Sequence, residues 1–125
     1  MGVSIYYAAS RSEALTSVEQ AAIDSVVARY PVEDLRAECG VSEDEYDGEG
    51  FCVYPTNDPS EPGVVFKGAT KLPLCTEDAF WAALQYWCRL LSEVRCVVPS
   101  ATWQVHVDDR DIVWVEELRA FDPSV

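Results

Sequence analysis

The strongest candidate for chemistry is an acidic run within residues 41–50, VSEDEYDGEG. Carboxylates at alternate positions before a glycine are typical of the EF-hand calcium loop, which also needs a bidentate glutamate at its far end. With Glu43 as the first ligand, Gly48 falls at the turn glycine, but Tyr54 falls where the glutamate is required. The sequence therefore predicts that this run holds no metal, and a weak calcium site of another kind remains the alternative.

The charge of the chain favours a different use of the run, as a docking surface for a basic protein. The 125 residues carry a net charge of −13, and residues 33–61 hold ten acidic residues against one arginine. Such a surface repels nucleic-acid phosphates and anionic membranes, whereas it speeds salt-sensitive association with a basic partner. The plainer alternative is that these acids only keep a small protein in solution. We expect a partner to contact six residues, with the tyrosine as anchor: Glu43, Asp44, Glu45, Tyr46, Asp47 and Glu49.

The single histidine, His106, is the other residue with catalytic chemistry. Strand alternation places it on the opposite face from Trp103 and Val105, with the carboxylates of Asp108 and Asp111 close in the chain. A histidine oriented by a carboxylate can act as a general acid or base. Because no nucleophile signature accompanies it, the sequence favours a plain surface histidine over an enzyme. A catalytic or ligand-binding role on an open sheet face is the alternative.

The cysteines indicate a reducing compartment and no cofactor. Their number is odd and no C-x-x-C pair occurs, so neither a disulfide scaffold nor a zinc site is indicated. The N-terminus lacks the pattern of a signal peptide, and no apolar run is long enough to span a bilayer. We therefore expect a cytoplasmic protein with reduced thiols at Cys39, Cys52, Cys75, Cys88 and Cys96.

Helices are expected on either side of the acidic run. Thr16 and Glu19 form a capping box at the start of the first helix, which Pro31 ends. A short acidic helix then precedes Gly40, and Thr76 is the expected N-cap of a longer helix. Core packing against a sheet is predicted for its apolar stripe, which consists of Phe80, Leu84, Trp87, Leu91 and Val94.

The alternation of apolar and polar residues predicts five strands. They are expected at residues 3–8, 51–54, 64–67, 102–109 and 112–118. The resulting order, β-α-β-β-α-β-β, matches a ferredoxin-like α+β sandwich with an added C-terminal strand and two helices packed on one sheet. The length fits one globular domain over residues 1–125.

Charge concentration without a catalytic signature predicts an interaction module. The leading hypothesis is an inhibitor or immunity-type protein that covers the basic active site of a partner, such as a nuclease, and has no chemistry of its own. The alternative is a small enzyme or ligand-binding domain that uses the sheet face around His106. A third alternative is a homodimer joined through the C-terminal hairpin.

Overall fold

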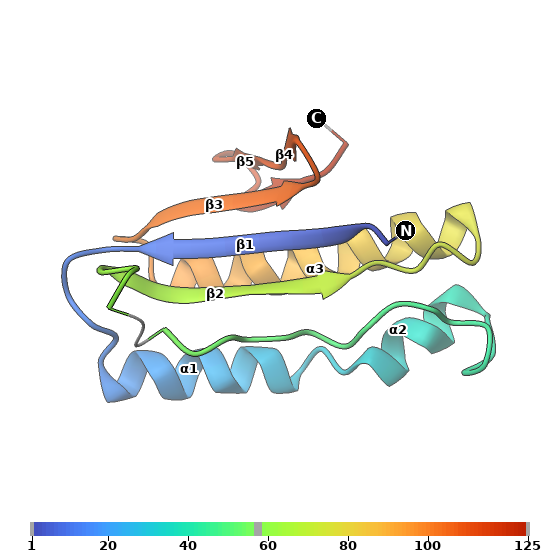
Figure 1. Ribbon diagram of the computed structural model, residues 1–125, viewed down its shortest axis with the longest axis horizontal. Helices are drawn as coiled ribbons and strands as arrows, with labels where there is room; N and C mark the ends of the chain where they lie inside the picture. The colour runs from blue at the N-terminus through green and yellow to red at the C-terminus, as the bar shows by residue number, and fades with distance from the viewer. Residues whose placement is uncertain (1, 57–58, 125) are drawn as a thin grey trace.

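The computed structural model describes residues 2–56 and 59–124, and this part of the chain is an α+β fold (Figure 1). Its helices are α1 (Ser17–Ala28), α2 (Val32–Cys39) and α3 (Glu77–Val97). Its strands are β1 (Ser4–Ser10), β2 (Val64–Lys71), β3 (Thr102–Val107), β4 (Arg110–Asp111), β5 (Val113–Val115) and β6 (Ala120–Asp122).

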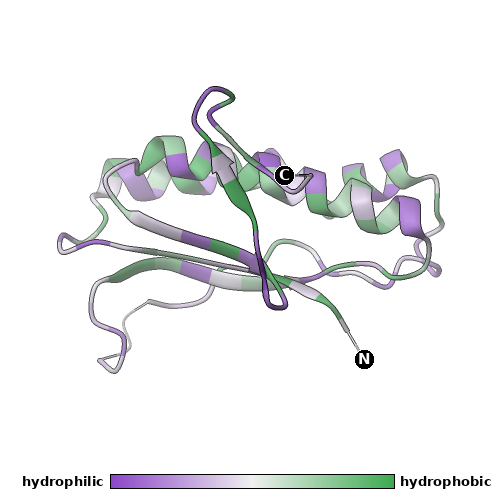
Figure 2. Ribbon diagram, turned by 90° about the horizontal axis from the view of Figure 1, so that it is seen from above, coloured by the Kyte–Doolittle hydropathy of each residue, from purple (hydrophilic) through white to green (hydrophobic). Residues whose placement is uncertain are grey.

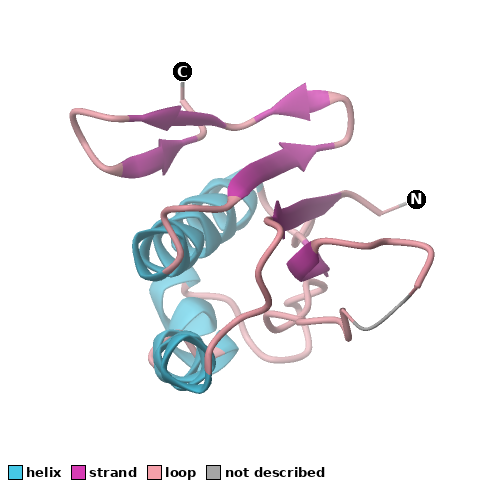
Figure 3. Cartoon of the chain, turned by 90° about the vertical axis from the view of Figure 1, so that its left-hand side faces the viewer, coloured by secondary structure: helices cyan, strands magenta, loops and turns pink. Residues whose placement is uncertain are grey.

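The main sheet is antiparallel throughout, with the strand order β2-β1-β3-β4. Alternate residues of the central strand β1, namely Ile5, Tyr7 and Ala9, are buried, because the helices cover that face (Figure 3). The outward residue Tyr6 is 41% exposed. No helix lies over that face of the sheet in the described part of the chain (Figure 3). The two expected helices on one side of a sheet are therefore confirmed, and the opposite face is open.

Local sequence signals predict both capped helix starts and the end of α2, whereas α1 ends at Ala28, before the expected Pro31, which is the N-cap of α2 instead. The capping box between Thr16 and Glu19 is formed at α1, and Thr76 accepts a hydrogen bond from the N–H of Ala79 at α3. Gly40 ends α2 in the left-handed conformation, which costs glycine little because it has no Cβ. Apolar and polar residues alternate along the helices (Figure 2). On α3, Trp87 is completely buried at the centre of the predicted stripe.

The predicted strand at residues 51–54 is absent, although the segment is extended. It runs antiparallel beside β2, since the N–H of Tyr54 donates to the carbonyl of Lys67 at 2.9 Å. The regular ladder is interrupted because the N–H of Cys52 bonds to the side chain of Thr70 at 3.2 Å instead of to the backbone. This arrangement is compatible with ferredoxin-like topology, but the second strand of that topology does not form.

Strand β2 is longer than predicted because Gly68 and its neighbours pair with β1 instead of forming a loop. A Cβ on Gly68 would lie 2.2 Å from the carbonyl oxygen of Cys52 and 2.6 Å from the ring of Tyr7. Only glycine lets the extended segment and the tyrosine ring cross the strand at this point. The glycine thus marks a close approach of two backbones, and not the start of a loop.

The predicted strand at residues 112–118 is wrong in extent and pairing. Only the two residues of β4 add to the main sheet, while β5 turns back to pair with β6 in a separate two-stranded sheet. This hairpin packs on α3, where the N–H of Phe121 donates to the hydroxyl of Ser92 at 2.9 Å. The guanidinium of Arg95 lies 4.2 Å from the ring centroid of Trp114. Contacts with α3 therefore fix the hairpin more than the sheet does.

Within the part of the chain that the structure describes, no helix is both long enough and apolar enough to cross a bilayer. The longest helix, α3, carries charged residues along its exposed side, including Asp78, Arg89 and Glu93.

Candidate functional site

The acidic run forms an exposed turn directly after α2. The N–H groups of Glu45 and Tyr46 both donate to the carbonyl of Ser42 at 3.1 Å, which closes the turn. The carboxylate of Glu45 also accepts a hydrogen bond from the hydroxyl of Ser42 at 3.0 Å. Glu43, Asp44 and Glu45 are all exposed, so three consecutive carboxylates face solvent at one point of the surface.

Tyr46 lies in the core and does not project as an anchor for a partner. Its side chain is 8% exposed and belongs to the same buried cluster as Leu35 and Leu72. Its hydroxyl is buried and has no hydrogen-bond partner among the described residues. The side chain that the sequence predicts as an anchor is therefore buried, and its ring holds the acidic turn to the body of the protein.

Asp47 and Glu49 also serve the fold. The carboxylate of Asp47 accepts hydrogen bonds from the N–H groups of Leu74 at 2.8 Å and Cys75 at 3.1 Å. Desolvation alone would raise the pKa of Asp47, but these donors outweigh it and hold that pKa below its ordinary value. The carboxylate of Glu49 accepts from the N–H of Lys71 at 2.9 Å. Both acids therefore tie the segment after the turn to the chain that leads from β2 to α3.

The exposed carboxylates continue from the turn along α2. Only one of the α2 acids has an ion pair among the described residues, which is Glu38 with Arg89 at 3.6 Å, and both side chains are exposed. An exposed pair of this kind contributes little stability. We call the whole surface the acidic face, and it comprises Glu33, Asp34, Glu38, Glu43, Asp44 and Glu45.

The described residues contain no group of three or more histidine, cysteine, aspartate or glutamate side chains that could hold a metal ion. The acidic run in particular disperses its carboxylates, because Asp47 and Glu49 turn to backbone donors while Glu43 and Asp44 face solvent. The arrangement suits long-range attraction of a cationic surface better than coordination of a cation.

The second candidate site is a hollow on the open face of the main sheet. Its volume is about 370 Å³, and Tyr6, Tyr54, Gln104 and His106 are among its lining residues. Tyr54 comes from the extended segment beside β2, while the other three come from β1 and β3. Sequence alternation correctly placed His106 on this outward face, but the contribution of Tyr54 depends on where the extended segment lies.

His106 is held in one orientation by its ring partners. It stacks on Tyr6 with a centroid distance of 5.1 Å and an interplanar angle of 16°. Its Nδ1 lies 2.8 Å from the backbone carbonyl oxygen of Asp108, a residue with a left-handed φ of 52°. A carbonyl can only accept, so Nδ1 carries the proton and Nε2 of the neutral ring is an acceptor. The backbone of Asp108 thus orients the ring, in the place where a carboxylate was expected.

The thiols that could have served His106 as a nucleophile lie outside the hollow in the described part of the chain. No cysteine lines it, and the thiol of Cys52 donates to the carbonyl of Gly50 at 3.3 Å. All five cysteines are free thiols. The structure therefore brings His106 together with tyrosines, the amide of Gln104 and the ammonium of Lys67.

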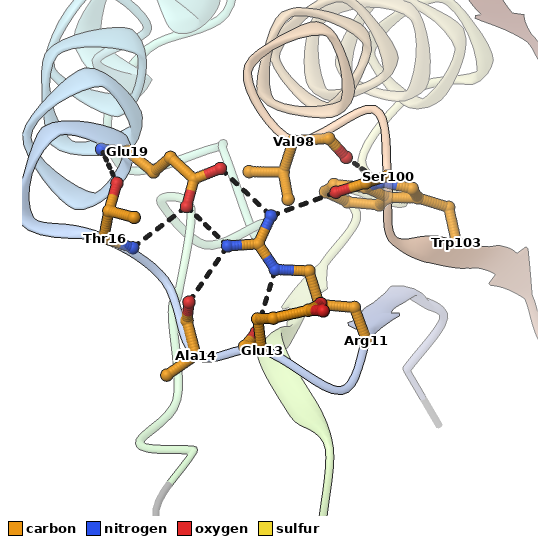
Figure 4. Close-up of polar contacts among 8 residues, drawn as sticks. All are labelled: Arg11, Glu13, Ala14, Thr16, Glu19, Val98, Ser100 and Trp103. Atoms are coloured by element: carbon orange, nitrogen blue, oxygen red, sulfur yellow. Dashed lines mark hydrogen bonds and ion pairs between the residues drawn. The ribbon is translucent and has the colours of Figure 1, made fainter.

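The sequence did not predict a cluster of hydrogen bonds around Arg11 (Figure 4). The guanidinium donates to the backbone carbonyls of Glu13 and Ala14, to both carboxylate oxygens of Glu19, and to the hydroxyl of Ser100 at 3.1 Å. Every N–H direction of the fork is used, so the cluster joins the start of α1 to the connection between α3 and β3 and leaves no donor for a ligand. Hydrogen bonds from Arg11, with others from Thr16, lower the pKa of Glu19 to about 2.

Comparison of the chain with protein-family models, with curated proteins and with solved structures finds no match in any of the three. Inference about function therefore depends on the acidic face and the hollow themselves.

Proposed function

We propose that this protein is an acidic protein-binding module that covers a basic surface of a partner protein, in the manner of an inhibitor or immunity-type protein. The observation that carries the proposal is the set of three consecutive exposed carboxylates, Glu43, Asp44 and Glu45, on a turn that is tied to the body on its C-terminal side. The buried ring of Tyr46 and the backbone contacts of Asp47 hold the turn in place. A turn that is ordered before binding loses little conformational entropy when a partner docks.

The electrostatics support the same partner class. A net charge of −13 on 125 residues produces an attractive field for basic proteins and a repulsive one for nucleic acids. Association should therefore be fast and weaken as salt screens the charges. The mechanism is occlusion, in which carboxylates of the acidic face pair with arginine and lysine side chains of the partner. No chemical step on this chain is required.

The test compares two variants with the same change in net charge. In the first, Glu43, Asp44 and Glu45 are replaced by lysine; Asp47 and Glu49 stay, because they hold the fold. The control variant carries E13K, D109K and E117K at three exposed acids outside the acidic face. Each tagged protein is used for a pull-down from native lysate over a salt series, and retained proteins are identified by mass spectrometry.

A basic protein that is retained by wild type and by the control at low salt, and lost from the first variant, would support the proposal. Equal retention by all three proteins would show that the position of the charges is irrelevant, and the docking role of the turn would be refuted. Retention by none of them at any salt concentration would also count against a basic protein partner.

We further propose a cytoplasmic location for this activity, which the five free thiols support. An antiparallel sheet with helices on one face also supports a distant relation to ferredoxin-like sandwiches, whose second strand the segment at residues 51–54 would represent. The redox state of the cysteines, measured by thiol alkylation in the native cell, tests the location, since oxidised cysteines would contradict it.

The hollow on the sheet supports a second candidate function, the binding of a small molecule. The favouring observation is that four side chains from three separate segments, Tyr6, Tyr54, Gln104 and His106, converge on one concavity. Its volume of about 370 Å³ lies within the range of small-molecule sites. A larger side chain placed inside the hollow should abolish ligand binding. An unchanged affinity would exclude this function.

A further inference from the structure

The hollow is built into the register of the main sheet. The outward-facing residues of its three long strands stand in two rows across the face. One row is Ala69, Tyr6 and His106, and the other is Lys67, Ala8 and Gln104. The two alanines have only methyl side chains, so they form a low floor between larger neighbours. The concavity therefore follows from the placement of small and large residues at paired positions.

Aromatic rings form two walls of the hollow. Tyr6 is 41% exposed and Tyr54 is 46% exposed, although both belong to well-packed segments. The stack on His106 fixes the ring of Tyr6. Tyr54 is fixed through its backbone, which bonds to Lys67, and through the neighbouring Cys52. The two exposed rings, beside a floor of alanine methyl groups, offer a surface for a flat molecule.

The lining of the hollow has no unbalanced charge. The ammonium of Lys67 forms an ion pair with the carboxylate of Glu61. The remaining polar lining groups include the amide of Gln104 and the imidazole of His106. An anion would meet the net negative field of the chain, and Lys67 is already paired, so the hollow disfavours anions.

The polar groups present both donors and acceptors. In the neutral form of His106, Nε2 is an acceptor, because Nδ1 donates to the carbonyl of Asp108. The side-chain amide of Gln104, which is adjacent to His106 in the outward pattern of β3, offers an N–H donor and a carbonyl acceptor. A ligand that satisfies them needs a donor next to an acceptor, as in a carboxamide or a neutral heteroaromatic ring.

From these features we infer that the hollow binds an uncharged planar ring that carries an amide-like donor and acceptor pair, with the ring against the tyrosines and the polar edge toward Gln104 and His106. This inference deepens the second candidate function and depends on it, whereas it is independent of the acidic face.

Three probes of nearly the same shape test two things separately, namely whether the hollow binds a ligand and which charge the ligand carries. Benzamide is neutral, benzoate is an anion and benzamidine is a cation, while the ring and overall size stay the same. Each is titrated into the ¹⁵N-labelled protein, and the amide shifts of Tyr6, Ala8, Ala69 and Gln104 are followed by NMR. We expect saturable shifts with benzamide and at least about tenfold weaker binding of benzoate, which corresponds to a free-energy difference of about 1.4 kcal/mol.

A substitution that fills the floor of the hollow provides a second test, and the same substitution elsewhere is its control. Ala8→Leu places a larger side chain at the bottom of the hollow and should abolish the benzamide shifts, while Ala21→Leu, at an exposed position of α1, should leave them unchanged. Circular dichroism and the urea midpoint establish that both variants are folded.

The outcomes distinguish two kinds of failure. If no probe shifts these amides, or if Ala8→Leu binds as wild type does, the hollow is not a ligand site and the second candidate function falls with it. If benzoate or benzamidine binds as tightly as benzamide, the site stands but the inference of an uncharged ligand is overturned.

Discussion

The hydroxyl of Tyr7 donates a hydrogen bond to the backbone carbonyl of Cys52, 45 residues further along the chain. The hydroxyl oxygen of Tyr7 also lies 2.8 Å from that of Thr70, which in turn accepts from the N–H of Cys52. Because Tyr7 has one proton and gives it to the carbonyl, Thr70 must donate to Tyr7. Each group in this buried network is therefore satisfied, and the network holds the extended segment and Tyr54 against β2.

Tyr7→Phe should loosen this segment. The substitution removes the donor to the carbonyl of Cys52 and leaves a partly buried acceptor without its partner, which costs about 1–3 kcal/mol of unfolding free energy. Urea unfolding measures the loss, and faster hydrogen exchange at the amide of Tyr54 would localise it. Tyr6→Phe, on the exposed outer face, serves as the control. Equal midpoints for the two variants would contradict a structural role for the network.

Gly68→Ala should destabilise the same crossing by steric contact. The added Cβ would lie 2.2 Å from a backbone oxygen, which cannot move aside as the end of a flexible side chain could. Overpacking of this kind costs about 1–3 kcal/mol, measured by urea or thermal unfolding. The matched control is Gly50→Ala, whose nearest neighbour is Val32 at an ordinary contact distance of 3.6 Å. A Gly68→Ala protein as stable as the control would show that the segment does not approach β2 so closely.

Acid should weaken the link between Arg11 and Glu19. Hydrogen bonds from Arg11 lower the folded-state pKa of Glu19 to about 2, below its ordinary value of 4.5. The contribution of the carboxylate to stability is therefore complete above pH 4.5 and is lost as the pH falls toward about 2. Glu19→Gln should be less stable than wild type at pH 7, and this difference should shrink as the pH falls through that range.

Thermal unfolding between pH 7 and pH 2 measures the effect on Glu19. Glu13→Gln makes the same chemical change at a residue whose hydrogen bond to Arg11 comes from its backbone carbonyl and whose carboxylate acts on Arg11 only through space, so it should change the midpoint at pH 7 less than Glu19→Gln does. A difference between wild type and Glu19→Gln that stays constant down to pH 2 would refute the assignment of the shift to this contact.

Substitutions of Tyr46 test whether its side chain stabilises the fold or anchors a partner. Tyr46→Phe removes a buried hydroxyl that has no partner in the described part of the chain, so stability should stay equal or rise by up to about 1 kcal/mol. Tyr46→Ala would leave a cavity and should cost about 3–5 kcal/mol. Chemical unfolding measures both. A Tyr46→Phe variant that folds normally but no longer retains a basic partner would restore the anchor role that the burial argues against.

Local signals in the sequence were sufficient for the helices. The capping box of Thr16 and Glu19 and the left-handed Gly40 act within a few residues, so their effect does not depend on the rest of the fold. Strand alternation was likewise enough to place His106 outward and Val105 inward, because successive side chains of a strand must point to opposite faces. The sequence also determined the concentration of negative charge that motivates the proposed function.

Contacts between distant residues decided the rest. The hydrogen bond from Arg11 to Ser100 spans 89 positions, and nothing near either residue in the chain indicates it. Whether residues 51–54 form a strand depended on how closely they cross Gly68, and whether Tyr46 faces a partner or the core depended on the space beside α2. Local patterns record the preferences of a segment, whereas its partner across the fold is chosen by packing and by the need to satisfy buried polar groups, and these exist only in the assembled chain.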